Sequence, residues 1–179
     1  MATETLRPNA AGDECNIDKQ SGAACPNHYL NVDEVESDEH TTRNLTKSTS
    51  WLRDLYNIQD HIVGIDIISK IAVYALCWRP IVITASQSIK VCIKTGGVVH
   101  EDLPRAIPDA TWTYIIKEWA INPTTGFAFT WAEIDALQIG IALRSCNLPL
   151  EDYTMCTQMY VVVTCAALVA GRSQAHLIS

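Results

Sequence analysis

The sequence WAINPTTGFAFTWAEIDALQ, at residues 119–138, carries the clearest structural instructions in this chain. Its first part is a turn signal. Asn122-Pro123 favours a turn, because the Asn side chain can accept a hydrogen bond from the backbone two residues on and Pro presets φ. Gly126 supplies a position at which a left-handed backbone has no steric cost. A strand is therefore expected to end before this turn.

The second part of the stretch predicts a short helix. Residues 130–133, Thr-Trp-Ala-Glu, have the form of a capping box, in which the first and last residues bond to each other's backbone amides. We expect the helix to begin at Trp131 and to end at Gly140. Its apolar stripe at i, i+3 and i+7 would consist of Ile134, Leu137 and Ile141.

Length and composition indicate one globular domain. The chain has 179 residues, of which 48% are hydrophobic and 18% charged, and this is enough for a sizeable core. The formal net charge is -7 and there is no Lys/Arg cluster, so a nucleic-acid partner is not expected. No window reaches the roughly 18 consecutive apolar residues of a spanning helix, so membrane insertion is not expected either. Nothing in the sequence implies a cofactor.

Alternating apolar residues predict strands from residue 65 onward. Residues 71–78 are apolar on both faces, and residues 89–94 have one polar face and precede a Gly96-Gly97 turn. Further strands are expected at 111–119, 139–144 and 154–165. The last of these would place Met155, Thr157, Met159, Val161 and Val163 on one face.

This pattern predicts an all-β fold, an antiparallel jelly-roll sandwich with one short helix. Residues 1–20 precede the alternating segments and are expected to form an extended N-terminal arm. Residues 21–179 would form the jelly-roll domain.

Seven cysteines are spread along the chain without a zinc-binding spacing. Their number is typical of a disulfide-stapled extracellular protein, yet the first residues lack the apolar core of a signal peptide. A virion protein, or a fibre protein exported by another route or processed before this numbering begins, would reconcile the two observations. Free buried thiols are the alternative to bridges. The candidate disulfides pair Cys15 with Cys25, Cys77 with Cys92, and Cys146 with Cys156.

Several segments together resemble a known family. They are LRPNAAGD at 6–13, HYLNVDE at 28–34, DLY at 54–56, the block at 122–138 and CTQMYVVV at 156–163. In this order they resemble a family of single-domain jelly-roll proteins that is widespread in phage virion modules and in environmental bacterial and archaeal sequences. Its most specific mark is Asn-Pro-x-Thr-Gly-x-Ala-x-Thr-Trp, in which Phe129 stands here for the usual Trp. The resemblance implies a structural protein and transfers no catalytic residue.

The N-terminal arm is the candidate assembly site. An extended segment can insert into a neighbouring subunit and complete its sandwich through main-chain hydrogen bonds, and head-to-tail donation propagates into a filament. The alternative is that the arm is a frayed terminus or pairs with its own sheet. The residues assigned to the donor segment are Thr3, Glu4, Thr5, Leu6, Arg7, Cys15 and Ile17.

A segment rich in potential metal ligands lies at residues 28–40. His28, Asp33, Glu34, Asp38, Glu39 and His40 fall within thirteen positions, but their spacing is not that of an EF-hand. A solvated acidic turn is the favoured interpretation, and no metal site is predicted.

Glycan binding would rely on exposed tryptophans, because aromatic rings can stack on sugars. Core or interface positions are their commoner role in a sandwich. The candidates are Trp51, Trp78, Trp112, Trp119 and Trp131. Asn44-Leu45-Thr46 is a glycosylation sequon, although one such triplet is close to chance.

These observations predict a non-enzymatic structural protomer, since no nucleophile, base and orienting group form a recognisable set. Its partner would be another copy of itself, and its place an extracellular, pilus-like filament or a virion appendage built by N-terminal donor-strand complementation. The alternative is a lectin-like carbohydrate-binding module or a capsid-decoration module.

Overall fold

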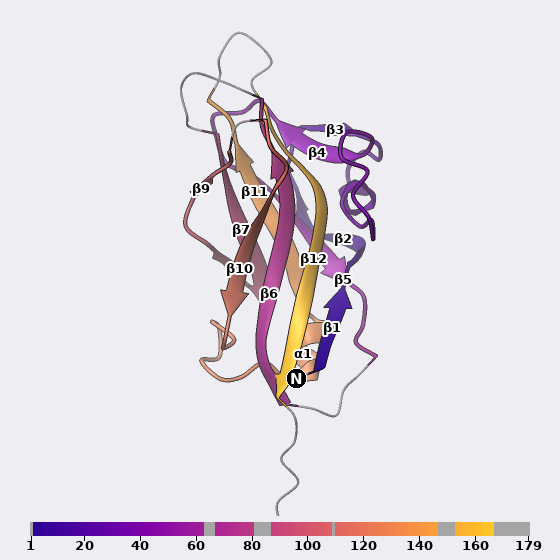
Figure 1. The fold of residues 1–179 in the computed structure, drawn as a ribbon. Helices are drawn as coiled ribbons and strands as arrows, with labels where there is room; N and C mark the ends of the chain where they lie inside the picture. Colours follow the sequence, from indigo (N-terminus) through magenta and orange to yellow (C-terminus); the bar gives the residue numbers. More distant parts are fainter. Residues whose placement is uncertain (1, 63–66, 81–86, 109, 147–152, 167–179) are drawn as a thin grey trace, which may run out of the picture.

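The computed structural model describes residues 2–62, 67–80, 87–108, 110–146 and 153–166. Two antiparallel six-stranded sheets pack face to face (Figure 1). Sheet A contains, in spatial order, β10 (Thr113–Trp119), β6 (Ile67–Trp78), β12 (Thr154–Ala166), β4 (Arg43–Thr46) and β3 (Lys19–Ser21), and β1 (Ala2–Leu6) also pairs with β12. Sheet B contains β2 (Pro8–Cys15), β5 (Leu52–Ile58), β11 (Gln138–Arg144), β7 (Ser88–Thr95) and β8 (Val98–Glu101), and β9 (Arg105–Ala106) also pairs with β7. The helical elements are the 3-10 turn η1 (His28–Asn31) and α1 (Trp131–Asp135).

The strand order confirms the predicted jelly roll. From β4 to β12, leaving the two-residue β9 aside, sheet A receives β4, β6, β10 and β12 in the order β10-β6-β12-β4. Sheet B receives β5, β7, β8 and β11 in the order β5-β11-β7-β8. Eight strands divided in this order between two antiparallel sheets form a jelly roll. No helix among the described residues is long and apolar enough to cross a membrane.

The core lies between the two sheets. From β6 it receives Ile71, Val73, Ala75 and Cys77, which alternation places on one face of the strand. The predicted grouping of residues on one face of β12 is correct only in part. A register irregularity between Cys156 and Gln158 shifts the alternation, so that Cys156 joins the core cluster together with Met159, Val161 and Val163.

The stretch at residues 119–138 forms the predicted turn and helix. Gly126 has φ of 78°, and the amide of Thr124 donates to Oδ1 of Asn122 over 2.9 Å. Both hydrogen bonds of the capping box are present between Thr130 and Glu133. These contacts explain why a helix of only five residues begins where the sequence places it.

The predicted end of this helix at Gly140 is wrong, since β11 already begins at Gln138. Gly140 serves a different purpose. A Cβ at this position would lie 2.2 Å from the main-chain oxygen of Asp54 on the neighbouring strand β5. The glycine therefore allows β11 and β5 to approach closely.

The N-terminal arm is not a separate segment in this structure. Residues 2–6 form β1 along β12, and residues 8–15 form β2 along β5 (Figure 1). The boundary predicted at residue 20 falls inside β3. A single residue, Arg7, joins β1 in sheet A to β2 in sheet B.

Candidate functional site

The strand β1 is the part of the arm that lies at a sheet edge. It pairs with β12 from Ala2 opposite Cys165 to Leu6 opposite Val161, while β6 occupies the other side of β12. Leu6 is only 2% exposed and belongs to the core, whereas the side chain of Thr5 is exposed. The strand is thus held by main-chain pairing, by one large apolar side chain, and by Glu4, whose Oε1 accepts from the amide of Ile62 over 2.7 Å.

Arg7 fixes the point at which β1 joins the rest of the molecule. Its guanidinium donates to the main-chain oxygens of Glu34 and Val35, and lies 5.1 Å from the centre of the Tyr160 ring. Its own main-chain oxygen accepts from the amide of Gln59 over 3.0 Å. These contacts belong to Arg7 and not to β1, so they are independent of where residues 2–6 pair.

The other end of the predicted donor segment is firmly anchored. The amides of Asn16 and Ile17 both donate to Oδ1 of Asp54, over 2.6 and 2.9 Å. Ile17 is buried in the core, and Cys15 ends β2. Cys15 and Ile17 therefore belong to the body of the domain, and Thr3, Glu4, Thr5 and Leu6 are the assigned donor residues that lie in the edge strand.

Asp54 is the centre of a buried polar cluster that the sequence analysis missed. Its Oδ2 lies 2.8 Å from Nδ1 of His28 and accepts from the Tyr56 hydroxyl over 3.3 Å. The side-chain amide of Asn44 donates to the same Tyr56 hydroxyl and to the main-chain oxygen of His28. The cluster joins β4, β5, η1 and the end of β2. Asn44 is fully buried and bonded, so its sequon is not accessible in this fold.

Cys15, His28 and Asp54 place three potential ligand atoms within 4.8 Å of one another. A Cys-His-Asp set can serve nucleophilic chemistry when the thiol is ionised. Here burial raises the pKa of the Cys15 thiol far above its usual range, and contact with the Cys25 thiol and the charge of Asp54 raise it further. The Cys15 thiol therefore keeps its proton and is a poor nucleophile. Asp54 already accepts several hydrogen bonds. Cys15, His28 and Asp54 lie 13 and 26 positions apart in the sequence, so no local spacing indicates this cluster.

The acidic turn does not gather its carboxylates into a site. Asp38 and Glu34 both accept from the hydroxyl of Thr42, and Asp38 also accepts from the hydroxyl of Thr157. His28 is turned to Asp54 instead. Within the described ranges, three such ligands come together only at Cys15, His28 and Asp54. The acids close a loop against β12.

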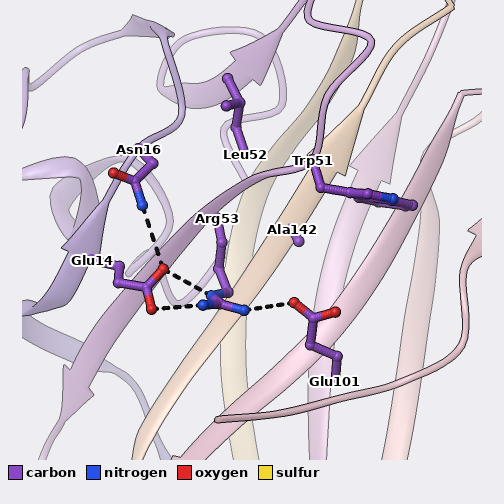
Figure 2. A pocket seen from close by; sticks show the side chains of 7 residues that line it. All are labelled: Glu14, Asn16, Trp51, Leu52, Arg53, Glu101 and Ala142. Carbon is purple, nitrogen blue, oxygen red and sulfur yellow. Dashed lines mark hydrogen bonds and ion pairs between the residues drawn. The ribbon is translucent and has the colours of Figure 1, made fainter.

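A hollow of about 440 Å³ lies on the outer face of sheet B. Figure 2 shows Arg53 between two carboxylates, with Trp51 on one side of the hollow. Arg53 donates two hydrogen bonds to Glu14 and one to Glu101, over 2.6 to 2.9 Å. The remaining lining residues are Asn16, Leu52 and Ala142.

Charges in and around the hollow are paired. Lys90 also donates to Glu101, over 2.6 Å. Burial alone would raise the pKa of Glu101, but the hydrogen bonds from Lys90 and Arg53 outweigh it and lower this pKa. The ammonium of Lys90 lies 4.6 Å, and the guanidinium of Arg144 4.7 Å, from the centre of the Trp51 ring. An aromatic wall beside fixed hydrogen-bonding groups is a surface that can receive polyhydroxylated ligands.

The other candidate tryptophans do not join this hollow. The ring centres of Trp78 and Trp112 are 6.3 Å apart, and both rings lie near the His40 ring. Trp119 contacts Lys117, and Trp131 stacks on His61.

All seven cysteines lie among the described residues, and none of them forms a disulfide in this structure. The Cys25 thiol lies 3.5 Å from the main-chain oxygen of Cys15, so the first predicted pair is close in space. The pairing of Cys146 with Cys156 stays a prediction, whereas the fold separates Cys77 from Cys92. Cys77 faces the core in sheet A, whereas Cys92 lies in sheet B on the side of Arg53 and Glu101.

Neither a protein-family model nor a curated protein matches the sequence. The resemblance to phage and environmental jelly-roll proteins therefore stays a prediction.

Proposed function

We propose that this protein is a non-enzymatic structural protomer that assembles with copies of itself by exchanging β1, as part of an extracellular filament or a virion appendage. The observation that carries the proposal is the placement of β1. It is a five-residue edge strand, joined through Arg7 alone to a strand of the opposite sheet.

Exchange preserves every contact of β1. In a neighbouring copy the same strand would pair with the same residues of β12 and place Leu6 in the same part of the core, so the enthalpy of the pairing is unchanged. Short hinges favour such swapping. Reciprocal exchange yields a closed dimer, whereas head-to-tail exchange yields an open filament.

Disulfide crosslinking tests the exchange directly. Thr5 lies opposite Val162 on the outer face of sheet A. One batch of protein carries Thr5→Cys and the other Val162→Cys, each with a different affinity tag, and the two are mixed before refolding. Exchange predicts a crosslink between the two tagged chains, detected by mass spectrometry. Thr5→Cys mixed with Leu103→Cys is the control, because Leu103 is exposed and lies outside the strands.

Two further variants define the role of the strand. Deletion of residues 2–6 leaves β2 and the Asp54 cluster in place, so it is expected to give a folded chain that no longer assembles. A short Gly-Ser insertion after Arg7 is expected to favour pairing within one chain and reduce the size of assemblies. Light scattering and electron microscopy measure both. The proposal fails if no crosslink joins position 5 of one tagged chain to position 162 of the other, and the deleted chain keeps the oligomeric state of the wild type.

A glycan-binding module is the second candidate, and the hollow of Figure 2 supports it. Trp51→Ala should abolish retention on a glycan array, whereas Trp112→Ala, which lies elsewhere, should not. If the wild-type chain binds no glycan on the array, this candidate is excluded.

A further inference from the structure

Two buried cysteines lie directly opposite each other in the centre of sheet A. The register of the antiparallel β6–β12 pair places Cys77 opposite Cys156. Both side chains are fully buried and both belong to the core cluster, so they project from the same face of the sheet. The Cys156 thiol lies close enough to Cys77 to raise the pKa of the Cys77 thiol.

This geometry meets the requirements of a disulfide. Residues directly opposite each other in an antiparallel pair have Cα atoms about 4.5 or 5.5 Å apart, depending on the hydrogen-bonding pattern. A disulfide needs Cα atoms separated by about 4.4–6.8 Å, and side chains that point toward each other. The irregularity in β12 beside Cys156 supplies the second condition, because it turns this side chain into the core.

We propose that Cys77 and Cys156 form a cross-strand disulfide when the chain folds in the presence of a small-molecule disulfide or a thiol-disulfide oxidoreductase. One thiol loses its proton and attacks the oxidant, giving a mixed disulfide, and the second thiolate then displaces the reduced oxidant. The protein thiols lose two electrons and two protons in total, and the oxidant gains them. This inference does not depend on strand exchange.

Timing follows from burial. Burial raises the pKa of the Cys77 thiol, and contact with Cys156 raises it further. The thiolate is the attacking species, so the bridge forms during folding, before the two sheets close over the pair.

Peptide mapping of the full chain tests the bridge. The denatured, reduced protein is refolded in a buffer of reduced and oxidised glutathione, and the remaining thiols are blocked with N-ethylmaleimide in denaturant. Digestion and mass spectrometry without reduction should reveal a peptide pair joined through Cys77 and Cys156. The proposal is overturned if both cysteines carry the maleimide, or if either is joined to another cysteine.

Thermal unfolding provides the matched control. The measurements use a Cys25→Ser background, since Cys25 is exposed and its thiol contacts Cys15. Reductant should lower the Tm of this chain, and should have no effect once Cys77→Ala and Cys156→Ala are added. Cys92→Ala should keep the full response, because Cys92 is equally buried but lies on the other sheet. Equal responses in all three chains would contradict the bridge.

Discussion

Replacement of Asp54 by Ala should destabilise the fold more than most single substitutions. Three donors would lose the acceptor that the structure gives them: the amide of Ile17, Nδ1 of His28 and the Tyr56 hydroxyl. The amide of Asn16 also donates to Asp54, but it keeps the main-chain oxygen of Arg53 as a second acceptor over 3.1 Å. Each buried donor left without a partner costs about 1–3 kcal/mol, and because the three share one acceptor we expect a total loss of about 4 kcal/mol. Typical domains have about 5–15 kcal/mol of stability, so the loss would be a large part of the whole.

The variant Asp54→Asn distinguishes the contribution of the hydrogen bonds from that of the carboxylate charge, because it removes the charge and keeps most of the bonds. The amide oxygen can keep both main-chain donors, and the amide nitrogen can donate to Nδ1 of His28 once the imidazole adopts its other tautomer. The Tyr56 hydroxyl loses one acceptor, so the expected cost is about 1–2 kcal/mol.

Urea unfolding, followed by tryptophan fluorescence, measures both variants. Asp60→Ala is the matched control, because Asp60 is exposed just after β5 and its loss should change the stability by less than about 0.5 kcal/mol. Amide hydrogen exchange should also become faster at Asn16 and Ile17 in Asp54→Ala. The reasoning is refuted if Asp54→Ala loses less than about 1 kcal/mol, the lower limit for one orphaned donor. If Asp54→Asn is as damaging as Asp54→Ala, the charge and not the hydrogen bonds holds the cluster.

Three further substitutions have defined outcomes. Gly140→Ala should cost at least about 2 kcal/mol or prevent folding, because its Cβ would clash with the main chain of Asp54; melting temperature and soluble yield measure this. Thr130→Ala should cost about 1 kcal/mol through loss of the cap bond to the amide of Glu133, measured by urea unfolding. Burial raises the pKa of Glu34, so its charged form is less stable in the folded state than in the unfolded state. Its unfavourable contribution therefore grows as pH rises through the carboxyl range, and Glu34→Gln should raise Tm at pH 7 but not at pH 4, where a similar gain at both would contradict the assignment.

Rules on turns and helix caps correctly predicted those parts of the fold that depend on contacts between residues close in the sequence. The turn at Asn122 and the helix at Trp131 depend on hydrogen bonds between residues two or three positions apart, and both are present. Simple alternation groups Ile71, Val73, Ala75 and Cys77 on one face of β6, and this face lies in the core. Such features need no knowledge of the rest of the chain.

Features that depend on distant partners were missed or misplaced. The irregularity in β12 reverses the direction of Cys156 and gives it Cys77 as a neighbour, and alternation cannot reveal one extra residue. Gly140 has the appearance of a helix end, but it is needed for close approach to Asp54 on another strand. The carboxylate of Asp54 has hydrogen-bond partners at residues 16, 17 and 28, which are distant in the sequence. Its role in the buried cluster therefore becomes visible only in the tertiary structure.

The same tertiary contacts restrict how copies of this chain could assemble. Arg7 and the Asp54 cluster hold both ends of β2, so only residues 2–6 are available for exchange. In the exchanged strand Leu6 would lie opposite Val161 of the acceptor, and Leu6 is bonded to Arg7. Consecutive Cα atoms are about 3.8 Å apart and opposite ones about 5.5 Å at most, so Val161 of the acceptor must lie within about 9 Å of the donor's Arg7. A filament built on this strand would consist of closely abutting sandwiches, with Arg7 and Tyr160 beside the contact, and not of domains spaced along flexible linkers.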